Sequence, residues 1–211
     1  MAIINQVVSG GGSPTPSGKY QLLQRVTDDS NNEIGAVCGY HTDANDVEYA
    51  VVCLDAAYRL ASGQIMSTKA AITGLPSYSN LSAYSAKETA TYNCNKILEQ
   101  CSVSGYTSSA ITHCRGQSFI IDGVEYAGQV PTAMELLKVF EHREGINAID
   151  PTSTANPTLI IPNATTTWAS TQYNNQYVSN YFFMCTLRGD VTFDNPTVSA
   201  FIIPILELPN A

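Results

Sequence analysis

The segment Gln129-Val-Pro-Thr-Ala-Met-Glu-Leu-Leu137 carries the start signals of an amphipathic helix. Thr132 and Glu135 have the spacing of a capping box, in which the hydroxyl accepts from a free backbone N–H and the glutamate reaches back. Pro131 stands just before this box, and Gly145 stands where a left-handed C-terminal cap would fall. The apolar stripe between these signals consists of Leu136, Leu137 and Phe140.

A second helix is predicted upstream. Residues Ser85-Ala-Lys-Glu88 read as its capping box. The apolar positions that follow at helical spacing are Ala90, Cys94, Ile97, Leu98 and Cys101. This stripe predicts a helix that packs against a sheet. Between the two helices, Asp122-Gly123 suits the two-residue turn of a tight β-hairpin over residues 117–127.

The remaining pattern is that of β-strands. Residues 20–60 alternate apolar and polar positions and contain a polar turn at residues 43–46, which predicts a hairpin of residues 34–40 and 48–54. Residues 62–84 read as a loop with room for one short strand. Three late strand candidates span residues 158–161, 181–187 and 199–208. Together with the two helices, they predict the α+β class.

Two further motifs accompany the helix at residues 129–137. They are the box Trp168-Ala-Ser-Thr171 and the closing strand Val198-Ser-Ala-Phe-Ile-Ile-Pro204. In this order the three pieces resemble the bacterial and phage branch of the C-type lectin-like domain, over about residues 84–208. The resemblance implies two helices packed on twisted antiparallel strands, with a long loop region before the last strands. We expect Trp168 to anchor the core.

Phage proteins of this branch serve as receptor-binding tips, and some are targets of diversity-generating retroelements that randomise Asn, Tyr and Ser codons. The resemblance therefore implies a recognition surface within residues 168–183. Tyrosine offers stiff amphipathic contact area, and asparagine adds adaptable hydrogen bonds. A Tyr- and Asn-rich structural loop between strands is the alternative. The candidate receptor-binding residues are Tyr173, Asn174, Asn175, Tyr177, Asn180 and Tyr181.

The chain departs from the animal lectins at their calcium-dependent sugar site. That site needs a Glu-Pro-Asn or Gln-Pro-Asp loop, whereas the comparable positions here read Asn156-Pro-Thr158 and Asn195-Pro-Thr197. Neither supplies the carboxylate and amide oxygens that a hard cation needs. We therefore expect no metal and no cofactor.

The first 19 residues read as an N-terminal arm, made of a short β-prone hook and a Gly/Ser/Pro linker. The apolar residues of the hook are Ile3, Ile4, Val7 and Val8. We predict that this hook completes a strand in a neighbouring virion protein or in another copy of the chain. A frayed end is the alternative. Residues 20–211 then form the lectin-like domain, with a β-hairpin region at its start.

Charge and composition limit the classes of partner. Charged residues make up 13% of the chain, about half the usual share, and the formal net charge is −8. Such a surface would repel a phosphate backbone, so nucleic acid and anionic membranes are poor candidates. The first residues show neither a basic leader nor a long apolar core, so we expect assembly in the host cytoplasm rather than secretion.

The sequence contains no recognised catalytic motif. The six cysteines lack metal-binding spacing and are interpreted as buried free thiols, with disulfides as the alternative. His41, His113 and His142 lie beside polar neighbours and are interpreted as solvated. His113 and Cys114 would point to opposite faces of a strand, which argues against a nucleophile pair. We expect no enzymatic activity.

These observations lead to one functional hypothesis and two alternatives. The leading hypothesis is a structural virion protein of a tailed phage that displays a lectin-like domain for host-surface recognition, with a protein or a glycan as receptor. Oligomerisation is expected, because shallow loop surfaces bind weakly one at a time. The alternatives are a capsid or tail decoration protein with a purely architectural domain, and a bacterial surface adhesin, which would form disulfides.

Overall fold

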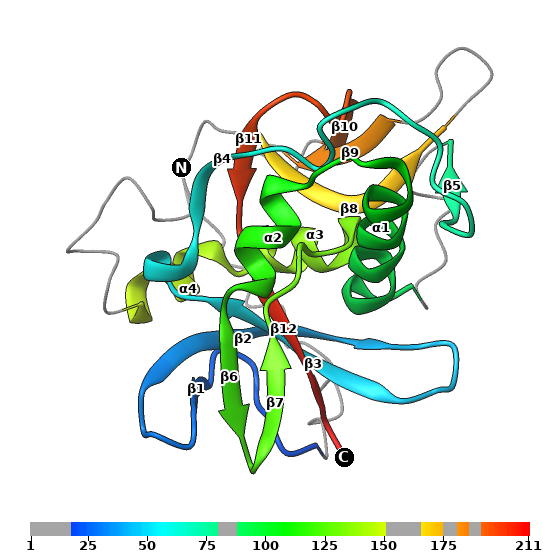
Figure 1. Ribbon diagram of the computed structural model, residues 1–211. Coiled ribbons are helices and arrows are strands. Elements are labelled where there is room, and N and C mark those ends of the chain that lie inside the picture. Colours follow the sequence, from blue (N-terminus) through cyan, green and yellow to red (C-terminus); the bar gives the residue numbers. More distant parts are fainter. Residues whose placement is uncertain (1–17, 80–87, 151–165, 175–180, 186–190) are drawn as a thin grey trace, which may run out of the picture.

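The structure is a computed structural model that describes residues 18–79, 88–150, 166–174, 181–185 and 191–211. Within these residues, helices and mainly antiparallel strands are mixed, which confirms the predicted α+β class (Figure 1). The predicted assembly residues Ile3, Ile4, Val7 and Val8 and the predicted strand at residues 158–161 lie outside the described residues. No helix in the described ranges is long and apolar enough to cross a membrane.

The first sheet joins the beginning of the domain to its end. Its strands in spatial order are β1 (Arg25–Thr27), β2 (Glu33–Thr42), β3 (Glu48–Leu54) and β12 (Ile205–Pro209). The β2–β3 hairpin confirms the predicted one, and Asp43 holds its turn by accepting from the backbone N–H groups of Asn45 and Val47. Strand β12 runs antiparallel to β3, with Leu206 opposite Val52.

The second sheet lies on the other side of the molecule (Figure 1). Its path is β10 (Val191–Asp194), β9 (Tyr181–Cys185), β8 (Thr167–Tyr173), β11 (Ala200–Ile202) and β4 (Leu60–Gly63). A two-residue strand, β5 (Ser77–Tyr78), pairs in parallel with the end of β8. The Trp168 box therefore lies in a central strand rather than in a surface loop.

The single strand predicted at residues 199–208 is two strands in different sheets. Pro204 separates β11 from β12, because proline cannot donate to a sheet ladder. Its carbonyl instead accepts from Leu54 N at 3.0 Å, as the chain passes from the second sheet to the first. This crossing ties the two sheets together.

Four α-helices accompany the two sheets within the described ranges. They are α1 (Ala90–Ser104), α2 (Ser109–Arg115), α3 (Ala133–Glu141) and α4 (Arg143–Ile149), and a 3-10 turn, η1, spans Ala56–Tyr58. The apolar stripe of α1 is buried as predicted at Ala90, Cys94, Ile97 and Cys101. The full capping box of α3 is present at Thr132 and Glu135.

Three local predictions about the helices are wrong. Helix α1 is capped by Thr89, whose hydroxyl accepts from Tyr92 N, so Glu88 precedes the helix instead of closing a box. Gly145 lies inside α4 and does not end α3. His113 lies on helix α2 rather than on a strand, because Ser108 caps a short helix that sequence periodicity did not reveal.

The predicted hairpin at residues 117–127 is confirmed as β6 (Ser118–Ile121) and β7 (Val124–Ala127). Asp122 and Gly123 have φ angles of 52° and 75°, as a primed two-residue turn requires. The Asp29 carboxylate accepts from the backbone N–H of both turn residues at 2.8 Å. The turn is thus held from the first sheet as well as by its own sequence.

Three apolar clusters fill the spaces between the layers. Helices α1 and α2 cover one face of the second sheet around Trp168, Phe182 and Met184. Helix α3 lies between the two sheets, and the β6–β7 hairpin covers the outer face of the first sheet. Because strand β8 is covered on both faces, all seven of its residues are buried.

Candidate functional site

The structure places the predicted receptor-binding residues in three different situations. Tyr173 is buried, with 6% of its surface exposed, so the expectation that it faces outward is wrong. Asn174 and Tyr181 are half-buried and lie where β8 ends and β9 begins. Asn175, Tyr177 and Asn180 lie outside the described residues.

Tyr173 belongs to the core because aromatic rings pack around it. Its ring stacks on Phe193 with centroids 3.8 Å apart and meets Phe183 edge-on at 5.2 Å. Side chains alternate along a strand, and both faces of β8 are covered here. Its partner residues come from β9 and β10, so their position depends on strand pairing.

Three residues form an exposed aromatic edge at this end of the second sheet: Lys69, Tyr181 and Phe193. The Lys69 ammonium lies 4.0 Å from the Tyr181 ring centroid, within the range of a cation–π contact. Phe193 meets Tyr181 edge-on at 5.9 Å and is 38% exposed. An apolar surface with a cationic rim is thus presented to solvent at the start of β9.

An open groove borders the same end of β8. Tyr78 of β5 pairs with Tyr173, and it lines a cavity of about 430 Å³ between the β2–β3 turn and the start of α1. Other residues of its wall are Asp43, Asn45, Pro76, Glu88 and Tyr92. Concave sites lined by aromatic rings with a few polar groups are the usual form of a ligand site.

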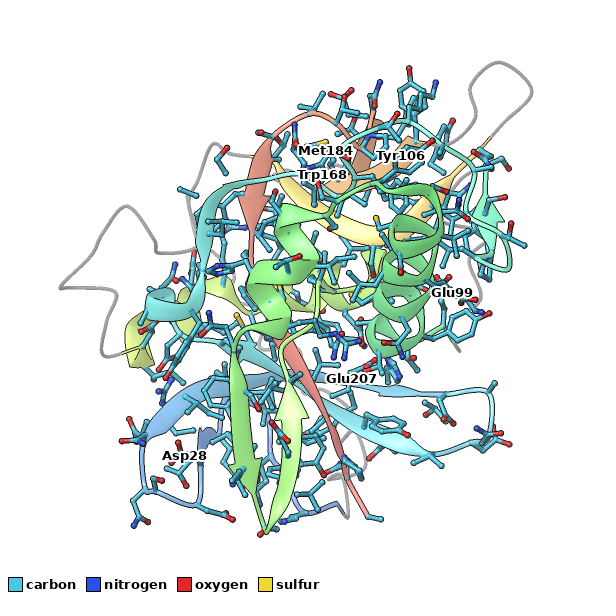
Figure 2. The ribbon with its side chains drawn as sticks, viewed as in Figure 1. Asp28, Glu99, Tyr106, Trp168, Met184 and Glu207 are labelled. Atoms are coloured by element: carbon cyan, nitrogen blue, oxygen red, sulfur yellow. The ribbon has the colours of Figure 1, made fainter. Side chains whose placement is uncertain are left out.

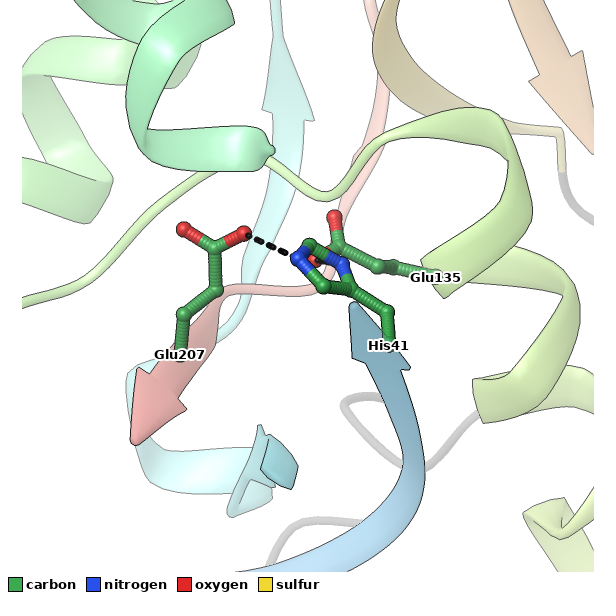
Figure 3. Close-up of side chains that lie close together, drawn as sticks. All are labelled: His41, Glu135 and Glu207. Atoms are coloured by element: carbon green, nitrogen blue, oxygen red, sulfur yellow. Dashed lines mark ion pairs between the residues drawn. The ribbon is translucent and has the colours of Figure 1, made fainter. Parts of the chain in front are cut away.

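A second constellation lies inside the molecule and was not predicted. His41, Glu135 and Glu207 form a buried His–Glu cluster, and no more than 6% of any of the three side chains is exposed (Figure 3). Glu135 Oε1 lies 3.0 Å from His41 Nδ1, and Glu207 Oε1 lies 3.8 Å from His41 Nε2. The interpretation of His41 as solvated is therefore wrong.

Each member of the cluster comes from a different element. His41 lies near the end of β2, and Glu135 is held in the first turn of α3, where its Oε2 accepts from Thr132 N at 2.8 Å. Glu207 lies in the middle of β12 (Figure 2) and accepts from Ala90 N and Thr91 N at 2.9 Å. Both carboxylates thus satisfy the free N–H groups of a helix start.

Burial decides the protonation of the cluster. It raises the pKa of Glu207 to about 8, and the adjacent Glu135 carboxylate adds to this rise. Burial also raises the pKa of Glu135, although hydrogen bonds from Glu207 and Thr132 oppose the shift. Burial lowers the pKa of His41, against the attraction of Glu207. At neutral pH the imidazole is therefore neutral and the carboxyl pair retains a proton.

The cluster has the chemistry of a metal-binding set. One imidazole nitrogen and two carboxylate oxygens lie within 4.8 Å of one another. His41 Nε2 is buried and makes no hydrogen bond with any described residue. Glu207 also lines a cavity of about 350 Å³ that reaches solvent between α1 and the β6–β7 hairpin.

Little in the sequence pointed to this cluster. Glu135 was predicted only as a helix cap, and His41 follows an ordinary apolar strand. Glu207 carried the clearest signal, since it is the one charged residue in the apolar run of residues 198–208. A carboxylate at such a position must find buried partners.

The other reactive side chains are engaged or unreactive. All six cysteines are buried and free, which confirms the predicted burial, and burial raises the pKa of the Cys94 thiol to about 12. His113 Nε2 lies 2.8 Å from the carbonyl oxygen of Tyr58.

Comparison of the chain with protein-family models, with curated proteins and with solved structures finds no match.

Proposed function

We propose that this chain is a structural virion protein of a tailed phage, with a C-type lectin-like domain that contacts the host-cell surface. The strand arrangement supports the fold proposal. The late strands β11 and β12 pair with the early strands β4 and β3, and the helices lie between them in the sequence. This is the layout that the motifs at residues 129–137 and 168–171 imply.

The aromatic edge carries the recognition proposal. Tyr181 of the aromatic edge pairs with Tyr173 from one side, and Tyr78 of the groove pairs with Tyr173 from the other. Both features therefore adjoin the end of β8. Tyrosine and phenylalanine rings bury large areas at low entropic cost, and the lysine adds attraction to polar or anionic surface groups. The recognition site is therefore proposed at Lys69, Tyr181 and Phe193 rather than at Tyr173.

A shallow site of this size binds weakly, so the proposal includes multivalent display. The hook residues Ile3, Ile4, Val7 and Val8 would dock into a neighbouring virion protein or another copy of the chain. Several copies held together in this way would raise the effective concentration of the recognition sites. Binding is by contact, without a chemical step, in a particle assembled in the host cytoplasm. With a net charge of −8, nucleic acid is not a proposed partner.

Substitutions at the aromatic edge should separate binding from stability. We expect Tyr181→Ala and Lys69→Ala each to reduce binding to host cells at least tenfold, while the melting temperature changes by only a few degrees. Fluorescent protein displayed on beads and titrated against a panel of bacterial strains by flow cytometry measures the binding. Tyr126→Ala is the matched control, because Tyr126 is another half-buried tyrosine but lies on β7 and packs against the cluster of the first sheet (Figure 1).

Equal binding by all three variants and the native chain would contradict the recognition site. It would favour the second candidate, a decoration protein in which the lectin-like domain is architectural. The burial of the whole of β8 favours that candidate, as does the Trp168 indole N–H donating to the Val198 carbonyl at 3.0 Å. A map of the assembled particle in which Lys69 and Phe193 are covered by other subunits would decide for it.

The third candidate, a bacterial surface adhesin, makes a different prediction about the cysteines. An exported protein would be expected to carry disulfides, whereas the six thiols are free and buried here. Counting free thiols in denatured protein from its native source distinguishes an exported adhesin from a virion protein assembled in the host cytoplasm. Six free thiols would support cytoplasmic assembly.

A further inference from the structure

We propose that His41, Glu135 and Glu207 form a binding site for one divalent transition-metal ion of the zinc type. The site is separate from the aromatic edge and does not depend on the recognition proposal. The three residues come from strand β2, helix α3 and strand β12, so an ion bound here would also hold these elements together (Figure 3).

The donor set matches the chemistry of such an ion. Zinc binds imidazole nitrogen and carboxylate oxygen at about 2.0–2.2 Å, so neighbouring donors in a tetrahedral site lie about 3.4 Å apart. The three donor atoms here lie within 4.8 Å of one another. A closure of about an ångström or slightly more by side-chain rotation would bring them to coordination distance.

The cluster contains a polar atom without a hydrogen-bond partner among the described residues, whereas a closed, metal-free polar network would satisfy all of its buried polar atoms. His41 Nε2 is buried and faces Glu207 Oε1 at 3.8 Å, which is too far for a hydrogen bond. A buried polar atom without a partner is costly. A proton shared by the two carboxyl groups reduces their repulsion but leaves this nitrogen unsatisfied, whereas a metal ion would engage all three side chains.

The surrounding hydrogen bonds hold the two carboxylates in fixed orientations. Thr132 N donates to Glu135 Oε2, and Thr91 donates to Glu207 Oε2 from both its backbone N–H and its hydroxyl. These donors leave Glu135 Oε1 directed toward His41. Fixed hydrogen bonds of this kind orient the side chains that bind a metal ion.

An ion has a route to the cluster. Glu207 belongs both to the cluster and to the wall of the 350 Å³ cavity, whose other polar wall residues include Thr91, Arg115, Glu125 and Gln129. Three protein ligands leave a fourth position for water, as in open zinc sites.

Titration with Zn²⁺ alone tests the proposal. After treatment with a chelator and dialysis, the full chain at pH 8 should bind one equivalent of Zn²⁺ by calorimetry, and its melting temperature should rise by several degrees. Glu207→Gln keeps the size of the side chain but removes the anionic ligand, so it should lose the binding and the thermal shift. Glu125→Gln, at an exposed position on the same cavity, is the matched control and should retain both.

Cobalt identifies the ligands. Co²⁺ bound by imidazole and carboxylates should show d–d absorption without a thiolate charge-transfer band, and Glu207→Gln should abolish that absorption. The absence of stoichiometric Zn²⁺ binding by the native chain would overturn the proposal. So would a thiolate band, or undiminished binding by a folded Glu207→Gln variant.

Discussion

Replacing Tyr173 with alanine is expected to lower the free energy of unfolding by about 3–5 kcal/mol. The side chain is 6% exposed, and the substitution removes a ring stacked on Phe193 and in edge contact with Phe183. The cavity left between strands β8, β9 and β10 cannot close easily, because each ring is fixed by strand pairing. Chemical denaturation followed by the fluorescence of Trp168 measures the change.

Tyr92→Ala is the matched control for this experiment. Tyr92 is 44% exposed on helix α1, so the same substitution there should cost about 1 kcal/mol, mostly through the lost hydrogen bond to the Gly74 carbonyl. A Tyr173→Ala variant as stable as the native chain would mean that the ring is not in the core. In that case Tyr173 would return to the recognition surface on which the sequence had placed it.

The second large effect expected is a loss of stability as the pH rises. Burial and the Glu135 carboxylate raise the pKa of Glu207 to about 8 in the folded chain, above its usual value near 4.5. Between pH 4.5 and 8 the folded state holds a proton on Glu207 that the unfolded state has released. The stabilisation that this proton gives is complete below pH 4.5 and is lost as the pH rises through 8. Between pH 6.5 and 9 the free energy of unfolding should fall by about 2 kcal/mol.

The window above pH 6.5 isolates the carboxyl group. The lowered pKa of His41 has the opposite effect on stability. Because the folded state resists protonation of this imidazole, His41 destabilises the folded chain only as the pH falls below about 6.5. The charges of Lys138 and Glu88 also act on the cluster: Lys138 opposes protonation of His41, and Glu88 raises the pKa of Glu135. Urea denaturation at each pH, with a chelator present, gives the profile.

Glu207→Gln should flatten this profile, because an amide has no proton to lose. The variant should also be more stable than the native chain at pH 9, where the native carboxylate is charged and buried. A native chain whose stability is constant from pH 6.5 to 9 would show that Glu207 is ionised throughout. The pair of carboxylates would then be stabilised by the two helix starts alone.

Local signals in the sequence predicted those parts of the fold that short segments determine. The capping box at Thr132 and Glu135 and the primed turn at Asp122 and Gly123 involve residues within three positions of one another. The hydrogen bonds of the capping box form inside the segment itself, and the primed turn follows from the positive φ angles that its two residues adopt readily. The apolar stripe of α1 was predictable for the same reason.

Signals were misread where a distant partner competes with a local one. Glu88 has the spacing of a helix cap, yet Glu207 occupies the start of α1, from 117 positions away from Ala90. Residues 199–208 look like one strand, but Pro204 divides them between two sheets. Local spacing cannot show which of two acceptors reaches a helix start.

The sequence by itself determined the α+β class, the helix and turn signals and the acidic, weakly charged surface. Tertiary structure decided whether the tyrosine, histidine and glutamate side chains of the two candidate sites face water. Tyr173 reads as a contact residue until β9 and β10 pack around it, and His41 reads as solvated until α3 and β12 bring Glu135 and Glu207 to it. The physical reason is that burial and pKa depend on neighbours brought together by folding, whereas propensity and capping depend on neighbours along the chain.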